Sequence, residues 1–260
     1  MATESGYFDI QADMGITKHM GGRIATKQLV RLAGIKKGDK VLEIGSGVGR
    51  TACFLAKVYE VKVDSIDISP KMVKRSLARA SKMGLSDQVN FICADAQKLP
   101  FEDGSFDLII SESVTAFIPD KKQALSEYQR VLKPKGVVAI NEVTWKATPD
   151  PKMVAYTKLV MGGPTFYTQK EWEKLLISSG FENVTSQIQQ FNVKEQLIGE
   201  LQQFNLLEYL HSLARFSIQM LINVKYWRFM ITVLSQPKQL FTFTKKIEQG
   251  FYIAKKTDNF

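Results

Sequence analysis

The stretch Val41-Leu42-Glu43-Ile44-Gly45-Ser46-Gly47-Val48-Gly49-Arg50 decides the fold of this chain. An apolar run ends in an acidic residue, and three glycines at alternate positions then lead into a helix-like segment. Glycine has no Cβ atom, so the turn can be tight and a ligand can lie directly against the backbone. The free N–H groups at the start of the next helix would point at that ligand. The stretch therefore predicts a strand, a nucleotide-binding loop and a helix.

The spacing of these glycines distinguishes two kinds of nucleotide-binding loop. A dinucleotide fingerprint, G-x-G-x-x-G, would require glycine at position 50, where this chain has Arg50. The pattern from Glu43 to Gly49 is E-x-G-x-G-x-G instead. It resembles the loop of the class I S-adenosylmethionine-dependent methyltransferases. A nicotinamide-dependent reductase on the same kind of sheet stays open as the enzymatic alternative.

Strand-like and helix-like segments alternate from residue 40 onward, which is typical of an α/β fold. Two helix starts are clear, because Ser69 precedes Pro70 and Thr168 precedes Glu171 by three residues. The predicted fold is Rossmann-like, a mostly parallel seven-stranded sheet with helices on both faces and a helical cap inserted before the last strand. The predicted strands are 40–44, 61–66, 89–93, 106–111, 137–141, 184–191 and 251–255, and the predicted helices are 22–33, 51–59, 69–83, 120–132 and 168–179.

At 260 residues the chain suits one domain with a sizeable core. No internal repeat or low-complexity tract divides it. We expect four consecutive parts within this single domain: an N-terminal helical extension at 1–39, the core at 40–192, the helical cap at 193–246, and the last strand and tail at 247–260.

Acidic residues follow the second and third predicted strands. Asp67 lies 22 residues beyond Gly45. A carboxylate at that place accepts hydrogen bonds from ribose hydroxyls in dinucleotide folds, so we predict that Asp67 binds a ribose. The alternative is that Asp67 only caps the helix near Ser69. Asp95 follows the third strand, in Cys93-Ala94-Asp95-Ala96-Gln97, and its alternative is a simple loop acid.

Further segments resemble the same methyltransferases in order and spacing. Phe106–Ser111 is similar to the family's fourth strand, and Arg130–Gly136 is similar to the turn before its fifth strand. That turn usually reads L-K-P-G-G, so Lys135 departs from the pattern. The resemblance covers about residues 38–145. Within the class, it is to the small-molecule methyltransferases of ubiquinone and menaquinone biosynthesis.

The resemblance implies which residues hold S-adenosylmethionine, a nucleoside joined to an amino acid through a cationic sulfur. Glu43 and the backbone of the glycine loop would hold the methionine end, with the Ser111 carbonyl near its ammonium group. Asp95 would accept from the adenine amino group while the Ala96 N–H bonds a ring nitrogen. Ile68 and Met72 would pack on the adenine and ribose, although Met72 is equally explained as helix core. The predicted cofactor-binding residues are Glu43, Gly45, Ser46, Gly47, Gly49, Asp67, Ile68, Met72, Asp95, Ala96 and Ser111.

Methyl transfer is a direct displacement at carbon, so the protein mainly aligns the reacting groups. A base is needed only where the acceptor must lose a proton. We predict His19, Glu142 and Tyr167 as catalytic residues near the expected cleft, with Glu112 and Trp145 as further candidates. The alternative for His19 is a surface histidine, and the alternative for Glu142 is a non-catalytic carboxylate.

The segment 193–246 interrupts the alternation and is rich in apolar residues. We expect one or two helices that pack over the core as a lid and desolvate an apolar or amphiphilic acceptor. His211, inside this segment, is expected to be structural. The side chains predicted to meet the acceptor are Phe204, Phe216, Met220, Tyr226, Trp227, Phe229 and Met230.

A peripheral membrane contact is the alternative for the cap. A spanning helix is not expected, because Lys225 and Arg228 would each cost about 2.5 to 3.5 kcal/mol in a bilayer. After the fourth strand the chain reads Ser111-Glu112-Ser113-Val114, without the N-P-P-Y or D-P-P-Y run of amino-methylating nucleic-acid and glutamine methyltransferases. The predicted partner is therefore a small molecule or lipid.

Composition limits the other classes of function. The formal net charge is +9, but the lysines are scattered, so no nucleic-acid partner is predicted. Cys53 and Cys93 lack a C-x-x-C spacing, so neither a disulfide framework nor a metal site is predicted and a reducing compartment fits best. The N-terminus has no signal-peptide pattern, which favours the cytoplasm, with membrane association left open. A catalytically silent cofactor-binding protein is the non-enzymatic alternative.

Overall fold

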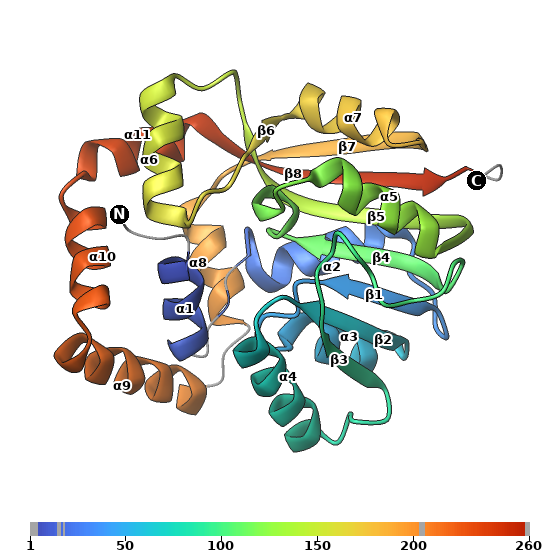
Figure 1. The fold of residues 1–260 in the computed structure, drawn as a ribbon, viewed down its shortest axis with the longest axis horizontal. Coiled ribbons are helices and arrows are strands. Elements are labelled where there is room, and N and C mark those ends of the chain that lie inside the picture. Colours follow the sequence, from blue (N-terminus) through green and yellow to red (C-terminus); the bar gives the residue numbers. More distant parts are fainter. Residues whose placement is uncertain (1–4, 15–16, 18, 203–205, 258–260) are drawn as a thin grey trace.

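A computed structural model describes residues 5–14, 17, 19–202 and 206–257 of the chain (Figure 1). The strands in this part are β1 (Lys40–Ile44), β2 (Lys62–Asp67), β3 (Val89–Cys93), β4 (Phe106–Glu112), β5 (Leu132–Trp145), β6 (Tyr167–Thr168), β7 (Phe181–Gln190) and β8 (Ile247–Lys256). They form one eight-stranded sheet in the order β3-β2-β1-β4-β5-β8-β7, with β6 paired to β5. The strands from β3 to β5 are parallel, whereas β8 is antiparallel to both of its neighbours.

Helices cover both faces of the sheet, and each face has its own apolar core. The helices are α1 (Ser5–Met14), α2 (Gly22–Ala33), α3 (Arg50–Tyr59), α4 (Pro70–Met83), the 3₁₀ turn η1 (Thr115–Phe117), α5 (Lys121–Val131), α6 (Pro151–Met161), α7 (Gln169–Ser178), α8 (Val193–Leu201), α9 (Leu206–Ile222), α10 (Val224–Leu234) and α11 (Pro237–Lys246). On one face, α2, α3 and α4 bury residues such as Leu29 and Leu55 against the strands. On the other, α5 and α7 bury Tyr128 and Trp172.

The predicted Rossmann-like fold is confirmed, and all seven predicted strands form. The sheet also has an eighth strand, the two-residue β6. The turn expected within 130–136 lies inside the bounds of β5, as an irregularity of its pairing: Phe106 pairs with Leu132, but Leu108 pairs with Val137. Lys135 has φ 63°, in the left-handed region that glycine, the residue usual in the family pattern, adopts without strain.

Three helical features differ from the sequence prediction. α1 was not predicted, because its apolar residues follow no clear helical period. α6 was also missed, although Asp150 before Pro151 is a start signal and its side chain accepts from the Met153 N–H. The described part of 193–246 forms four helices rather than one or two, with breaks at Asn223 and before Pro237.

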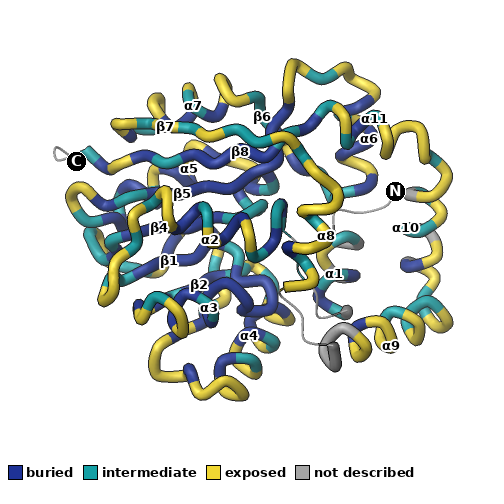
Figure 2. Tube along the Cα trace, turned by 180° about the vertical axis from the view of Figure 1, so that it is seen from behind, coloured by how far each residue is buried: buried dark blue, intermediate teal, exposed yellow. Residues whose placement is uncertain are grey.

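The cap helices α8 to α11 lie between β7 and β8 in the chain and at one end of the sheet in space (Figure 1). The carboxyl ends of the parallel strands lie at this end of the sheet. α1 lies between the cap and the sheet (Figure 1). Buried residues gather in the sheet, while most described residues of α9 are exposed and those of α10 are partly exposed and partly buried (Figure 2). Among the described residues, no helix is both long and apolar enough to cross a membrane.

Candidate active site

A cavity of about 480 Å³ lies at the carboxyl ends of the parallel strands. Ile44 ends β1, Asp67 ends β2 and Glu112 ends β4, and all three line it. Side chains from α1, α6, α8 and α11 complete the wall. This is the edge where open α/β sheets bind their ligands, and here a cap encloses it.

The glycine loop between β1 and α3 forms one end of the cavity. Gly45, Gly47 and Gly49 have φ angles of 80°, 52° and 76°, all in the left-handed region. A Cβ atom on Gly45 would collide with Val114, and one on Gly47 would lie 2.6 Å from Cγ2 of Thr17. Glycine is therefore required both for the backbone conformation and for the space beside the loop.

Asp67 joins the glycine loop to the start of α4. Its Oδ2 accepts the Gly47 N–H at 2.8 Å, and its Oδ1 accepts the Ser69 N–H at 2.9 Å. Burial raises the pKa of Asp67 above its usual range, although both hydrogen bonds oppose that shift. Each carboxylate oxygen keeps lone-pair capacity for a further donor, such as a ribose hydroxyl.

The residues predicted at the adenine end line the same cavity. Asp95 is exposed, and its Oδ1 accepts the Gln97 N–H at 2.8 Å. Ala96 is buried beside it, and Ile68 is 73% exposed, as expected of a residue that would cover a ligand. Met72 both lines the cavity and belongs to a small core cluster, so its position is compatible with both of its sequence interpretations.

Glu43 is a buried carboxyl at the methionine end of the predicted site. It receives a short hydrogen bond from the hydroxyl of Ser65. Burial, reinforced by the charges of Glu112 and Asp67, raises the pKa of Glu43 to about 8. A cationic ligand beside this group would favour its ionised form.

Comparison with known proteins agrees with this geometry. A family model described as a methyltransferase domain matches residues 42–140. Over 188 residues the chain is 32% identical to an uncharacterized protein of Haemophilus influenzae, an alignment that covers 71% of this chain and 75% of that protein. The chain belongs to the class I S-adenosylmethionine-dependent methyltransferases.

Two further comparisons concern named methyltransferases. The chain is 40% identical over 110 residues to a probable chloroplastic tocopherol O-methyltransferase of Oryza sativa, which covers 42% of this chain and 30% of that protein. The structure of Haemonchus contortus phosphoethanolamine N-methyltransferase 2 with phosphomonomethylethanolamine and S-adenosylhomocysteine is similar with a TM-score of 0.74. It is 22% identical, over 96% of this chain and 57% of that one, so this likeness shows the fold. The chain spans less than a third of the rice protein's length.

The residues of this methyltransferase fit its cofactor, S-adenosylmethionine. The glycine loop leaves room that Cβ atoms would fill, and Asp67 and Asp95 present carboxylates along the cavity. Arg50, which the sequence analysis used only to exclude a dinucleotide, also lines the cavity and is 6% exposed. It is the one lysine or arginine among the described lining residues, and a guanidinium is well suited to a carboxylate such as that of a methionine.

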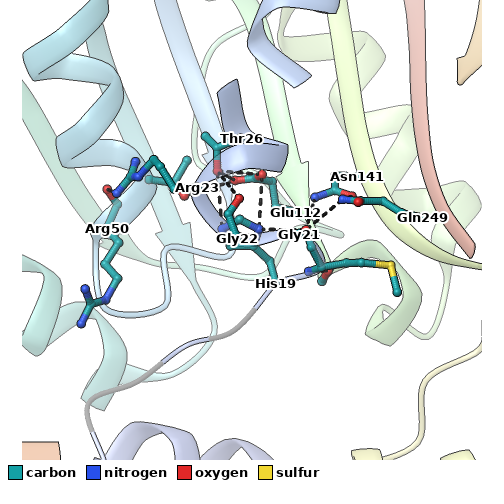
Figure 3. Close-up of polar contacts among 12 residues, drawn as sticks. His19, Gly21, Gly22, Arg23, Thr26, Arg50, Glu112, Asn141 and Gln249 are labelled. Carbon is teal, nitrogen blue, oxygen red and sulfur yellow. Dashed lines mark hydrogen bonds and ion pairs between the residues drawn. The ribbon is translucent and has the colours of Figure 1, made fainter. Parts of the chain in front are cut away.

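His19 and Glu112 meet on the cavity wall of the methyltransferase (Figure 3). The His19 Nδ1 lies 3.5 Å from Oε1 of Glu112. Glu112 in turn accepts hydrogen bonds from the hydroxyls of Thr26 on α2 at 3.1 Å and Thr51 on α3 at 3.2 Å. A histidine oriented by a fixed carboxylate is an arrangement that suits a general base.

The backbone next to His19 is held by side chains from four elements. The Met20 N–H donates to Ser113 after β4, and the Met20 carbonyl accepts from Asn141 on β5 and Gln249 on β8. On α8, Gln196 accepts the Gly21 N–H at 2.6 Å and donates to the His19 carbonyl at 3.2 Å. These contacts fix where His19 enters the cavity.

The other predicted catalytic residues do not line the cavity. Glu142 is fully buried and accepts the Ala116 N–H at 3.1 Å, and burial raises its pKa to about 7. Tyr167 packs its ring on Trp172, 5.3 Å between centroids. Trp145 supports the cavity from behind, against Phe166 and Phe243. The side chains of these residues support the wall rather than face the ligand.

Ser111 and His211 also lie away from the cavity. Ser111 is fully buried at the end of β4, with its hydroxyl 2.8 Å from that of Thr115. Its predicted contact through the carbonyl stays a prediction. His211 lies exposed on α9. It is the only other histidine of the chain.

Most of the other residues that line the cavity are apolar, and we call the part that they enclose the apolar chamber; Gln11, Gln196 and Glu200 are polar residues of the same cavity wall. The chamber wall differs from the predicted one, since none of the described side chains predicted for the cap lines it, and Phe204 lies outside the described residues. α1 supplies the wall instead, because Tyr226 of α10 hydrogen-bonds Asp13 of α1 at 3.1 Å and thus holds α1 inward. The chamber is lined by Tyr7, Phe8, Phe117, Ile118, Val143, Met161, Phe166, Phe191, Phe243 and Ile247.

Proposed function

We propose that this protein transfers the methyl group of S-adenosylmethionine to a small apolar or amphiphilic acceptor held in the apolar chamber. One observation carries the proposal: a single cavity runs from the glycine loop and Asp67 to a wall of phenylalanine side chains. A cavity of this size and lining suits an organic ligand that is mostly apolar with a few polar groups.

The chain's own residues would bind the cofactor in the order of its parts. Glu43, Arg50 and the glycine-loop backbone hold the methionine end, Asp67 holds the ribose, and Asp95 with Ala96 holds the adenine. Bound there, S-adenosylmethionine supplies a methyl group on a cationic sulfur, which a nucleophile takes by direct displacement. The apolar chamber excludes water and aligns the acceptor with that methyl group.

His19 is the proposed base. Where the acceptor is a hydroxyl or a phenol, His19 takes its proton as the bond to carbon forms, and Glu112 stabilises the resulting imidazolium. Glu142 and Tyr167 are not part of this proposal, since neither lines the cavity.

The chamber disfavours a phosphorylated acceptor. Phosphate recognition uses arginine and lysine side chains, and the described residues that line the chamber include neither. Arg50 lies next to the glycine loop in sequence, at the cofactor end. The name of the rice relative states tocopherol, a phenol, as its acceptor. A phenol or quinol suits the chamber better than phosphoethanolamine does.

Two measurements on the purified protein test this function. Calorimetric titration should show binding of S-adenosylhomocysteine and none of NADH, and NADH binding alone would support the reductase alternative instead. Radiolabelled S-adenosylmethionine should then transfer label to lipophilic phenols, quinols or sterols. Label on phosphoethanolamine, with none on the lipophilic acceptors, would refute the proposed acceptor class.

A further inference from the structure

The cap helices expose an unusual amount of apolar side chain. In the described part of the chain, 24 large apolar side chains are exposed, of which 15 lie between residues 193 and 246 and 9 lie elsewhere. Exposed apolar side chains concentrated in one segment in this way mark a contact with a partner or a membrane.

The exposed residues follow helix geometry. On α10, Val224, Trp227, Ile231 and Leu234 are spaced by three, four and three residues, so they share one side of the helix. The end of α9, just before α10, adds Leu221, which is 82% exposed, and Ile222, which is 71% exposed. We call the exposed sides of α9 and α10 the cap face, and its main apolar residues are Ile218, Leu221, Ile222, Trp227, Ile231 and Leu234.

Charge along the chain in this part of the cap has one sign. From residue 209 to residue 247 the chain has six basic residues and no acidic one. The nearest acids along the chain are Glu208 and Glu248. Apolar side chains, an exposed tryptophan and an excess of basic residues together are typical of helices that lie in a membrane interface. The basic residues are Arg215, Lys225, Arg228, Lys238, Lys245 and Lys246, of which Lys246 is paired with Asp150 at 2.6 Å.

The same charge argues against a second copy of the chain as the occupant. Two cap faces in contact would bring their basic residues together, which is unfavourable. An anionic bilayer offers both the apolar medium and the opposite charge, and each lysine or arginine near its surface adds about 1 kcal/mol of attraction.

The cap also connects this outer surface to the chamber. On α11, Phe243 lines the cavity, while Phe241 on the same helix is exposed. α10 reaches inward through Tyr226, which holds α1 against the chamber, and outward through Trp227. A contact on the outer side of the cap therefore involves α10 and α11, the same helices that hold or form the chamber wall.

We propose that the cap face docks on an anionic lipid bilayer, with α9 and α10 lying in its interface. Docking there places the chamber's enclosing helices next to the membrane, so an acceptor dissolved in the bilayer reaches the site without crossing water. The docking stands on the cap face alone, whereas the delivery of an acceptor rests on the proposed function.

Vesicle flotation of the full chain tests the docking. Vesicles of phosphatidylcholine with one quarter phosphatidylglycerol should carry the protein, and vesicles of phosphatidylcholine alone should carry far less. Of the three tryptophans, Trp145 and Trp172 are buried and Trp227 is 51% exposed, so a blue shift and quenching by brominated lipid report on the cap face. Trp227→Phe should remove that optical response.

Matched variants locate the contact. Leu221→Ser, Ile222→Ser, Ile231→Ser and Leu234→Ser together should weaken partitioning by about tenfold or more, since four apolar side chains no longer enter the interface. Val58→Ser with Ile177→Ser changes two apolar residues elsewhere that are 54% and 61% exposed, and should have no effect. Arg215→Glu with Lys238→Glu should also weaken binding at least about tenfold, unlike Lys82→Glu with Lys170→Glu.

Each outcome decides between occupants. Equal binding of the two cap-face variants and their two controls to anionic vesicles would overturn the proposal. The absence of any binding of the wild type to these vesicles would also overturn it. A dimer in sedimentation that the four-serine variant dissociates, without vesicle binding, would assign the cap face to a second copy. Retained S-adenosylhomocysteine binding shows that each variant is folded. Vesicle binding without methyl transfer would refute the proposed function and leave the docking intact.

Discussion

The Oε1 atom of Glu112, at the end of β4, lies 3.5 Å from Nδ1 of His19 in the segment before α2. Two threonine hydroxyls fix the carboxylate, and backbone contacts from four elements fix the histidine's position. The pair therefore faces the cavity in a defined arrangement before any acceptor binds. Residues 112 and 19 are far apart in the chain, so only the fold brings them together.

Replacing His19 should impair turnover while cofactor binding persists. For a hydroxyl acceptor, His19→Ala should lower kcat by about 100-fold or more, because the proton has no positioned base. The Kd for S-adenosylhomocysteine should stay close to that of the wild type. His211→Ala is the matched control, since His211 is the chain's other histidine and lies exposed on α9. Equal kcat values for His19→Ala and His211→Ala would show that His19 is not the base.

Asp67→Asn should weaken cofactor binding by about tenfold or more. In the variant, a neutral amide replaces the carboxylate that would accept from the ribose hydroxyls. The hydrogen bond from the Gly47 N–H then also goes to an uncharged oxygen. Asp64→Asn, on the same strand but paired with Lys40 and Asn90, serves as the control and should bind like the wild type. Isothermal titration with S-adenosylhomocysteine measures both. Unchanged affinity in Asp67→Asn would mean that this residue only caps α4.

Cofactor binding should release a proton near neutral pH. Burial raises the pKa of Glu43 to about 8, so its carboxyl is mostly protonated at pH 7 in the free protein. The cationic methionine end of the cofactor favours the carboxylate and lowers this pKa. Affinity should therefore rise from pH 6 to about 7.5, below the range in which an α-amino group itself loses its proton.

Calorimetry in two buffers of different ionisation enthalpy measures this proton directly. The wild type should release a fraction of a proton per cofactor at pH 7, and Glu43→Gln should release less. Tighter binding at pH 6 than at pH 7.5 would contradict the placement of Glu43 beside the cationic end.

The packing of α8 against α2 should be disturbed by a single added methyl group. A Cβ atom on Gly199 would collide with the carbonyl oxygen of Gly21, and one on Gly22 would collide with Gly199. Gly199→Ala should therefore displace α8, disturb the Gln196 contacts to the His19 segment and lower Tm by several degrees. Leu197→Ala, at an exposed position of the same helix, should leave Tm nearly unchanged. Thermal unfolding measures both, and equal Tm values would mean that α8 adjusts freely.

Sequence alone predicted the sheet, which the structure confirms, and a set of cofactor-binding residues, most of which line one cavity, because both depend on local signals. The glycine loop is specified by three residues whose backbone angles only glycine adopts readily, and Asp67 follows at a fixed distance from it. β5 is recognisable as an apolar run. These features need no knowledge of distant contacts.

The acceptor end could not be predicted in the same way. Its wall comes from α1, η1, α6 and α11, which meet only after folding, and the apolar residues of α1 follow no clear helical period. Glu112 became a partner of His19 through contacts from α2 and α3. Two of the aromatic residues predicted for the lid face α1 and solvent instead, since Tyr226 is bound to Asp13 and Trp227 is half exposed.

The KM for a lipophilic acceptor in Phe117→Ser tests the central claim most directly. Phe117 lines the chamber and contacts the rings of Tyr7 and Phe8, whereas Leu159 is an exposed residue of α6 that serves as the matched control. Loss of a large apolar contact should raise KM about tenfold in Phe117→Ser, with S-adenosylhomocysteine affinity unchanged, while Leu159→Ser keeps the wild-type KM. An unchanged KM in Phe117→Ser would contradict an acceptor site in the apolar chamber.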